Sequence, residues 1–466
     1  MNAPPTRGSD HDPGAAAPLE RGLGLLQATS LNIANMVGIG PFITIPLFLA
    51  TMNGPQAMIG WVLGAVLVLC DGLVWSELGA ALPGSGGTYH FLKEIFRPYR
   101  WGRLLPFLFV WQFLISGTLE MASGYVGAVD YLKYAFPDWQ HMFDRWGIPW
   151  GWSGIAALGC VLVVWMLSRR TRVVGWLAVG LTAGTLLTVL IVIVAGLTHF
   201  NPSLLKLPPD AFNLNLAFLL GLGGAMRIAV YDFLGYFNVC HLGDEVRTPG
   251  KTIPRAVILS VLVVATIYLT MNLSIIGVVP WQEAMKSQNV AALFMERLFG
   301  RPVAVAFTGL IVWTAIACMF AITLGYSRIP YAAAREGDFF RVFGKVHPRD
   351  HYPWLALMAM GALTAVFCFF PLQQIIDAAV TVRIVVQFMG QIIALHVLRT
   401  TRPDIRLPFR MWLYPLPSFI AFIGWIFLWV SSGWTLVLSG GGVIVSGCVA
   451  YVAWRKASNR TTMEPC

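Results

Sequence analysis

Long apolar runs alternate along this chain with short polar segments in which basic residues gather. A helix needs about 20 apolar residues to cross the hydrocarbon core of a bilayer, and twelve runs are long enough to be counted as spans. The runs cover residues 23–50, 56–82, 101–133, 150–168, 173–198, 216–241, 255–279, 303–327, 353–371, 374–398, 412–430 and 433–454. The pattern predicts an all-α integral membrane protein with twelve transmembrane helices.

The composition of the chain is that of a membrane protein. Of the 466 residues, 57% are hydrophobic and 12% are charged, against about 25% charged residues in a soluble domain. The polar segments are too short for a separate core, so we expect one membrane domain over residues 22–454, with polar tails at 1–21 and 455–466. The net charge of +10 lies in scattered loops with no continuous basic face. We therefore expect the chain to contact the lipid bilayer and to bind no nucleic acid.

The basic residues also indicate an orientation. If the N-terminus is cytoplasmic, the cytoplasmic segments hold 24 of the 32 lysines and arginines, the opposite loops hold six, and two lie inside spans. Loops 169–172 and 399–410 are clear examples. Positive residues favour the cytoplasmic side of a membrane. We therefore expect a multi-pass protein of the cell membrane with both termini cytoplasmic.

The first and sixth predicted spans carry helix-breaking residues. Gly38, Gly40 and Pro41 lie near the centre of the first span, and Gly235 interrupts the sixth span 195 residues after Gly40. Proline removes a backbone donor, and glycine lowers the cost of leaving helical geometry. We expect an unwound segment in the first span, and a simple proline kink is the alternative.

The two breaks lie in the first spans of two five-span units, at about 22–198 and 213–398. Because five is odd, the two units insert with opposite orientation. Interrupted segments at matching positions of two halves indicate a transporter site near the bilayer midplane. At such a site the N-termini of half-helices offer N–H groups to a carboxylate, and freed carbonyls accept from an ammonium group.

Four ionisable residues fall well inside predicted spans, namely Glu120, Arg227, Asp232 and Arg383. An unpaired charge at the bilayer centre costs at least about 2.5–3.5 kcal/mol, so each of them should face protein or water. Two interpretations are open: structural ion pairs that neutralise one another, or a coupling and charge network that contacts the substrate or relays a proton. Asp232 is the strongest functional candidate because it adjoins the predicted break.

The remaining reactive residues favour neither an enzyme nor a metal site. The seven cysteines include no C-x-x-C pair, and Pro348 and a polar loop separate His347 from His351, so we expect no metal, catalytic residue or cofactor. An intramembrane enzyme needs a nucleophile and a base that converge inside the spans, and a channel needs a carbonyl filter or a charged ring. Neither pattern is evident, and both classes stay as alternatives.

Four motifs stand out along the chain: GIGPF at 38–42, ELGAALPGSGGTY at 77–89, GDEVRTP followed by IPRA within 243–256, and RIPYAAAREG at 328–337. Together they resemble the amino acid–polyamine–organocation family of permeases. Their order and spacing match the family over nearly all of residues 22–454. The resemblance implies a LeuT-type five-plus-five inverted repeat, with peripheral eleventh and twelfth helices at 412–454. It also implies a substrate held between spans one and six and flanked by spans three, eight and ten.

The resemblance assigns a set of residues to the substrate. They are Gly38, Ile39, Gly40, Tyr231, Asp232, Phe233, Leu234 and Gly235. The backbone of the first three would receive a substrate carboxylate. The carbonyls of Phe233 and Leu234 would receive its ammonium group, and Tyr231 falls where many relatives place an aromatic gate.

This chain departs from the family pattern at the break. Ile39 replaces the usual serine, Pro41 removes one donor, and Asp232 adds an acid where many relatives are neutral. The expected function is secondary active transport of amino acids by alternating access, through ion coupling or exchange, and a polyamine or another organic cation is the alternative substrate. Some proton-coupled relatives carry a lysine in span five, which this chain lacks, so the coupling ion is open between H⁺ and Na⁺.

Overall fold

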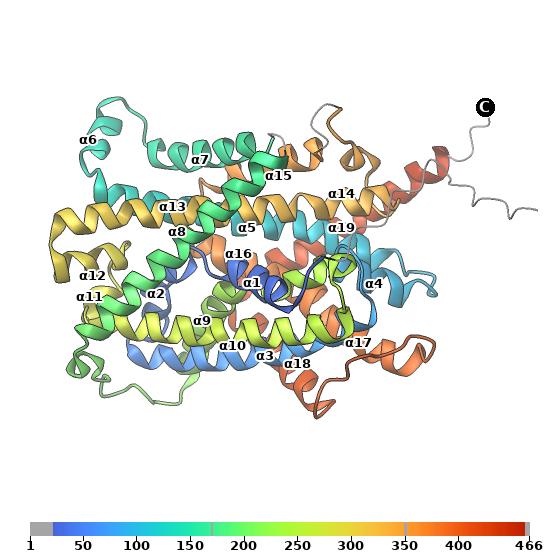
Figure 1. Ribbon diagram of the computed structural model, residues 1–466, viewed down its shortest axis with the longest axis horizontal. Coiled ribbons are helices and arrows are strands. Elements are labelled where there is room, and N and C mark those ends of the chain that lie inside the picture. Colours follow the sequence, from blue (N-terminus) through green and yellow to red (C-terminus); the bar gives the residue numbers. More distant parts are fainter. Residues whose placement is uncertain (1–21, 169–170, 349–351, 462–466) are drawn as a thin grey trace, which may run out of the picture.

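A computed structural model describes residues 22–168, 171–348 and 352–461. Within these residues every named element is a helix, and the β-type pairing consists of two isolated bridges. The helices form one bundle in which most axes run along a common direction (Figure 1). The predicted tail at 1–21, residues 462–466 of the other tail, and residues 169–170 of a basic loop lie outside the described residues.

Among the described residues, seven helices are long and apolar enough to cross a membrane, or eight if a bent pair is counted as one span. The seven cover Pro55–Ala81, Leu104–Ala135, Leu216–Phe233, Pro249–Ile276, Arg301–Arg335, Leu372–Thr401 and Trp434–Lys456. The bent pair is α1 (Leu25–Met36) with α2 (Gly40–Met52). Four shorter apolar segments cover Gly151–Leu167, Trp354–Phe367, Leu416–Ser431 and Gly184–Thr198, the last being the C-terminal part of α8 (Thr171–Thr198). The prediction of an all-α, multi-pass membrane protein is confirmed at this level.

Each predicted apolar run contains at least one helix of Figure 1. The longer helices are α3 (Met58–Ala81), α5 (Leu104–Ala135), α8 (Thr171–Thr198), α9 (Leu216–Phe233), α10 (Pro249–Ile276), α13 (Arg301–Tyr326) and α19 (Trp434–Thr461). The shorter ones are α7 (Gly151–Leu167), α15 (Trp354–Phe367) and α18 (Leu416–Ser431). The tenth run is built from three consecutive elements, α16 (Leu372–Arg383), the π-helix η6 (Ile384–Met389) and α17 (Gly390–Thr401).

The polar connections hold short helices that the apolar runs do not predict. These are α4 (Thr88–Phe96), α6 (Asp138–Arg145), α11 (Trp281–Ala284), α12 (Val290–Phe299) and α14 (Arg328–Arg335), with 3₁₀ turns η1 (Pro55–Ala57), η2 (Pro202–Leu205), η3 (Asn238–His241), η4 (Gly243–Glu245) and η5 (Arg341–Gly344). The longer of them are amphipathic: α4 buries Phe91, Leu92 and Ile95 on one face and carries Lys93 at its partly exposed side. A short helix of this kind has no apolar run to reveal it.

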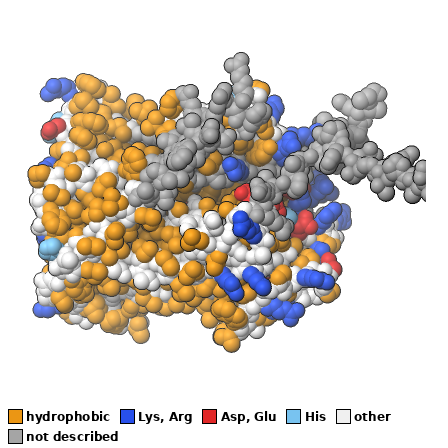
Figure 2. Space-filling model, in the orientation of Figure 1, with side chains coloured by type: hydrophobic (Ala, Val, Ile, Leu, Met, Phe, Trp, Pro, Cys, Tyr) orange, Lys and Arg blue, Asp and Glu red, His pale blue; other side chains and the backbone are white. Residues whose placement is uncertain are grey.

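The interior of the bundle is formed by two groups of helices. α3 packs against α9 and α10, and α5 packs against α13 and α16. α8 crosses the near face of the bundle obliquely and contacts α10 and α13 (Figure 1). Apolar side chains cover much of the face seen in Figure 2, and Leu190, Val430 and Val449 are among the exposed apolar residues of the molecule. An apolar exterior of this extent suits contact with lipid rather than water.

Candidate substrate site

The first helix break separates α1 from α2. α1 ends at Met36, α2 begins at Gly40, and the two axes are bent by 53°. Val37 adopts an extended backbone, so the segment is unwound rather than kinked at a proline. Pro41 stands in the first turn of α2, where its missing N–H costs no helical hydrogen bond. The interruption at residues 37–39 falls at the helix-breaking residues Gly38, Gly40 and Pro41, where an unwound segment was predicted.

The second break ends α9 at Phe233. Gly235 has a φ of +108°, in the left-handed region that favours glycine, and the 3₁₀ turn η3 follows at Asn238. A Cβ built on Gly235 would lie 2.9 Å from the Cβ of Asn35 near the end of α1. The two interruptions are therefore in direct contact. The helix stops eight residues before the end of the predicted span 216–241, because Gly235 turns the chain.

Buried polar side chains satisfy the backbone groups that the two breaks release. The Asn32 side chain donates to the Tyr236 carbonyl at 2.6 Å and accepts from the backbone N–H of Val239 at 2.8 Å. Tyr268 of α10 donates to the Met36 carbonyl at the end of α1, and Tyr131 of α5 donates at 2.7 Å to the Phe42 carbonyl, which Pro46 leaves without a helical donor. Irregular backbone at membrane depth is tolerated where the protein supplies such partners.

The carboxylate of Asp232 lies against the start of α2. Its side chain is buried, with the residue 3% exposed, and one carboxylate oxygen accepts from the Thr44 hydroxyl at 2.5 Å. The other oxygen, Oδ1, has no hydrogen-bond partner among the described residues. A Cβ added to Gly40 would collide with this same oxygen. The predicted site residues Gly40 and Asp232 are thus brought together, and no ion pair of Asp232 is formed within the described part of the chain.

The other three membrane charges are paired. Arg383 of α16 lies 2.5 Å from Glu120 of α5, and its Nε donates to Ser116 at 3.1 Å. Tyr326 of α13 donates to the same Glu120 carboxylate at 2.9 Å. This cluster links three helices with a buried ion pair. It agrees with the structural interpretation for Glu120 and Arg383.

Arg227 has a partner that the sequence analysis did not propose. Its Nε lies 2.7 Å from the carboxylate of Asp377 in α16, and Asp377 also accepts from Gln373 at 2.9 Å. The four charges inside the predicted spans therefore do not neutralise one another as two pairs, because Asp377 takes the place of Asp232. Asp377 is the fourth residue of the predicted span 374–398, so its place in a span was visible in the sequence, but its partner was not.

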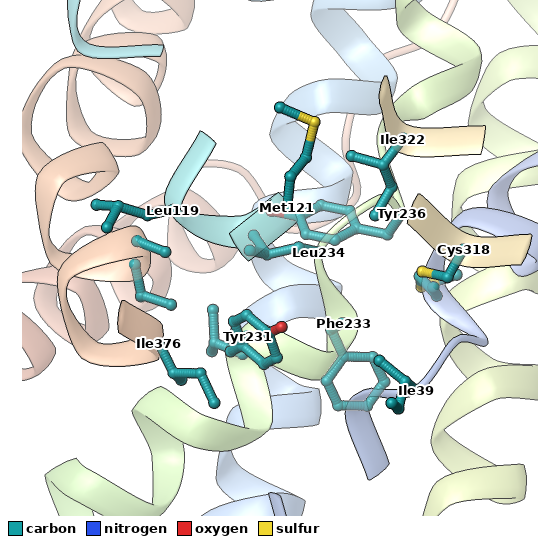
Figure 3. Close-up of a cluster of buried hydrophobic side chains, with 14 of the residues drawn as sticks. Ile39, Leu119, Met121, Tyr231, Phe233, Leu234, Tyr236, Cys318, Ile322 and Ile376 are labelled. Carbon is teal, nitrogen blue, oxygen red and sulfur yellow. The ribbon is translucent and has the colours of Figure 1, made fainter. Parts of the chain in front are cut away.

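Apolar side chains from five segments surround the breaks. Figure 3 shows Tyr231, Phe233 and Leu234 of the second break facing side chains of α5, α13, α16 and the linker between α1 and α2. Those neighbours are Leu119, Met121, Cys318, Ile322, Ile376 and Ile39. The Tyr231 hydroxyl lies 2.5 Å from Ser123 of α5. Among the described residues, this region is therefore apolar, with one acid that forms no ion pair and two released helix ends.

Comparison with known proteins decides the family. The family model for amino acid permeases matches residues 23–453, which is nearly the whole chain. The chain belongs to the amino acid permease family. It is 28% identical to the Asc-type amino acid transporter 1 of Mus musculus, over 89% of this chain and 77% of that protein. It is 25% identical to the serine/threonine exchanger SteT of Bacillus subtilis (strain 168), over 94% of this chain and 98% of the relative.

A third relative of the permease is the cystine/glutamate transporter of Homo sapiens, which is 28% identical over 90% of this chain and 82% of that protein. The family and these relatives are transporters, so the permease is an amino acid transporter and not an enzyme. The family resemblance inferred from the four motifs is confirmed.

The signature at 77–89 has a structural role in the permease. Glu77 is fully buried and accepts two hydrogen bonds from Arg399 of α17, at 2.6 and 2.7 Å, and one from the backbone of Met411 at 2.7 Å. Tyr89, at the other end of the signature, donates to Asp338 at 2.8 Å. The motif therefore ties the end of α3 and the short helix α4 to distant segments of the chain.

Asp71 is a second buried acid whose partners come from far along the chain. Trp425 of α18 donates to one of its oxygens at 3.0 Å, and the hydroxyl of Tyr236 donates to the other. Tyr236 belongs to the second break, so Asp71 joins α3, this break and α18. Asp71 falls within the predicted span 56–82, and nothing in the sequence indicates these partners.

Proposed function

We propose that the permease is a secondary active transporter that moves amino acids across the cell membrane by alternating access. The proposed architecture is the twelve-span, LeuT-type inverted repeat, with units at about 22–198 and 213–398 and peripheral helices at 412–454. Two features support it: breaks stand at matching points of the two units, and four shorter apolar helices supplement the longer spans. Cytoplasmic termini are part of the proposal, supported by the distribution of basic residues.

The observation that carries the substrate assignment is the juxtaposition of the two breaks, which brings the start of α2 next to the end of α9. The N-terminus of a helix carries roughly half a positive charge, so the start of α2 attracts a carboxylate. In this proposal the backbone of Gly38, Ile39 and Gly40 receives the substrate carboxylate. The carbonyls of Phe233 and Leu234 receive its ammonium group, and Tyr231 closes the site.

The position of Asp232 leads to a proposal for coupling. An ionised Asp232 would lie close to the bound carboxylate of an amino acid, and two like charges at this depth repel strongly. Protonation of Asp232 removes this repulsion. We therefore propose that Asp232 carries a coupling proton that accompanies the substrate, and that the paired Glu120, Arg383 and Arg227 hold the helices in place.

The same acid favours a second candidate substrate. If Asp232 stays ionised, it provides a counter-charge for an amine without a carboxylate, such as a polyamine. The two candidate substrates differ in how their transport should depend on the proton gradient and on pH. An amino acid should be driven inward with a proton, whereas an amine would bind better as the external pH rises and Asp232 ionises.

Counterflow of labelled substrate in proteoliposomes tests the proposal. Purified permease is reconstituted, the vesicles are loaded with one unlabelled amino acid or polyamine, and the entry of the labelled compound is followed. Accelerated exchange of an amino acid supports the main proposal, and exchange of a polyamine alone supports the second candidate. Chemical turnover of the compound, or an ionic current without exchange, contradicts transport by alternating access.

A further inference from the structure

A basic pocket lies away from the helix breaks, at the junction of α4, α5, α14 and α19. Its volume is about 720 Å³, and five basic and three acidic side chains line it. The basic ones include Arg97 and Arg100 in the connection after α4, Arg103 before α5, and Arg455 near the end of α19. Figure 2 shows Lys and Arg side chains gathered at the end of the molecule where α4 and α19 lie in Figure 1.

Two of the acids in the basic pocket already have partners. Lys93 lies 2.9 Å from Asp338 and in closer contact with Glu336. Burial acts to lower the pKa of Lys93, but its hydrogen bonds to Glu336 and Asp338 outweigh burial and raise the pKa, so the lysine stays charged. Lys93 thus shares its single positive charge between Glu336 and Asp338, and the pocket, with five basic and three acidic side chains, keeps an excess of positive charge.

The arginines of the basic pocket lack comparable partners. Arg103 lies 3.9 Å from Asp338, at the outer limit of an ion pair, and its side chain is 75% exposed. Arg97, Arg100 and Arg455 form no ion pair with the described residues. Several unneutralised guanidinium groups around one cavity favour an anion, and guanidinium matches phosphate oxygens in pairs.

The surroundings of the basic pocket indicate that this anion comes from a lipid. One wall is formed by Trp454 and Arg455 of α19, the least buried of the seven long apolar helices, so this wall borders the lipid-facing surface. Tyr99 lines the other wall, and its ring stacks at 5.6 Å on Trp101 beside the pocket; both side chains are exposed. Exposed tyrosine and tryptophan are typical of the membrane–water interface, where lipid headgroups lie.

We propose that the basic pocket binds the phosphate of an anionic phospholipid headgroup. Clusters of arginine at the cytoplasmic end of spanning helices attract anionic lipids, with about 1 kcal/mol contributed by each residue. A bound headgroup joins the end of α19 to the α4–α5 connection. The site is separate from the substrate site, so the proposal does not depend on which compound the permease transports.

Purified full-length permease in detergent provides the test. Phosphatidylglycerol, phosphatidylcholine and inorganic phosphate are titrated in separate arms, and the dissociation constant is taken from the rise of the melting temperature, because a ligand of the folded state stabilises it. The variants are Arg97→Gln with Arg100→Gln, and Arg455→Gln alone. The matched control is Arg255→Gln with Arg341→Gln, which removes the same charge from exposed residues outside the pocket.

We expect phosphatidylglycerol to bind wild-type permease more tightly than phosphatidylcholine does. Loss of Arg97 and Arg100 should weaken this binding about 30-fold, loss of Arg455 about fivefold, and the control should bind as wild type. Equal binding of both lipids, or an equal loss in the control, overturns the proposal. Binding of inorganic phosphate as tight as that of the lipid, lost in the same variant, assigns the pocket to a soluble phosphate compound and overturns the lipid assignment.

Discussion

Among the described residues Asp232 has no counter-charge, and its carboxylate is positioned by a hydrogen bond and by its contact with the start of α2. Thr44 donates to one oxygen, and the other faces Gly40 at the first turn of α2. The positive end of α2 is therefore next to an acid of the protein itself, at the place where a substrate carboxylate is proposed to bind. Any change in the space at Gly40 alters how both carboxylates approach this helix end.

Substitution of Gly40 by valine tests this crowding. The valine side chain would collide with Oδ1 of Asp232, so we expect normal membrane insertion with transport reduced more than tenfold. Uptake by reconstituted protein and the yield of folded protein are measured together. The matched control is Gly309→Val in α13, because nothing lies within 4 Å of a Cβ at that position. Wild-type uptake by the Gly40 variant would remove this residue from the site.

Among the helices, α5 and α16 are joined by a buried ion pair. Glu120 and Arg383 are buried together. The guanidinium carbon of Arg383 lies 5.4 Å from the ring centroid of Phe113 and 5.7 Å from that of Tyr326. Removal of one partner leaves an uncompensated buried charge. The pair therefore fixes how α5, α13 and α16 pack.

We expect Glu120→Gln to lower the free energy of unfolding by about 3–5 kcal/mol, measured by thermal or denaturant unfolding of the purified protein. The control is Glu283→Gln, whose exposed pair with Arg297 should contribute less than about 1 kcal/mol. Adding Arg383→Gln to Glu120→Gln should restore part of the loss. A loss no larger than that of the control would show that the buried pair does not hold these helices together.

The pattern of apolar runs predicted the helices well because length and polarity are local properties. The first break was also predictable, since Gly38, Gly40 and Pro41 oppose a helix wherever they occur. Partner choice was not predictable from one sequence. The pairing of Arg227 with Asp377 depends on how α9 and α16 pack, and no local pattern encodes it.

Short elements were missed for a related reason. The helix α4 lies in a polar signature and buries only one face, and the π-helix η6 differs from its α-helical neighbours by a hydrogen-bond shift that apolar runs do not reveal. At the candidate site, the resemblance supplied the residues around the breaks. It did not supply Asn32, Tyr131 and Tyr268, whose side chains form hydrogen bonds with backbone groups freed by the breaks and by Pro46.

At the scale of the whole molecule, the proposed orientation places the two ends of the bundle on opposite sides of the membrane. α6 and α14 lie toward opposite ends in Figure 1. We expect Arg145→Cys, at the end of α6, to react with an impermeant maleimide applied to intact cells, and Lys345→Cys, after η5, to react only after permeabilisation. Both residues are exposed or partly exposed. The reverse labelling pattern would invert the proposed topology.

The central claim is that the permease carries its substrate at the helix breaks with a proton on Asp232. The most direct test compares Asp232→Asn with wild type in proteoliposomes, and Asp130→Asn, whose carboxylate pairs with Lys133 at the end of α5, is the control. Wild type and control should concentrate a labelled amino acid in response to an inward proton gradient. Asp232→Asn should keep counterflow exchange and lose gradient-driven accumulation by more than tenfold. Accumulation by Asp232→Asn at the wild-type rate, with an unchanged dependence on pH, would contradict the account.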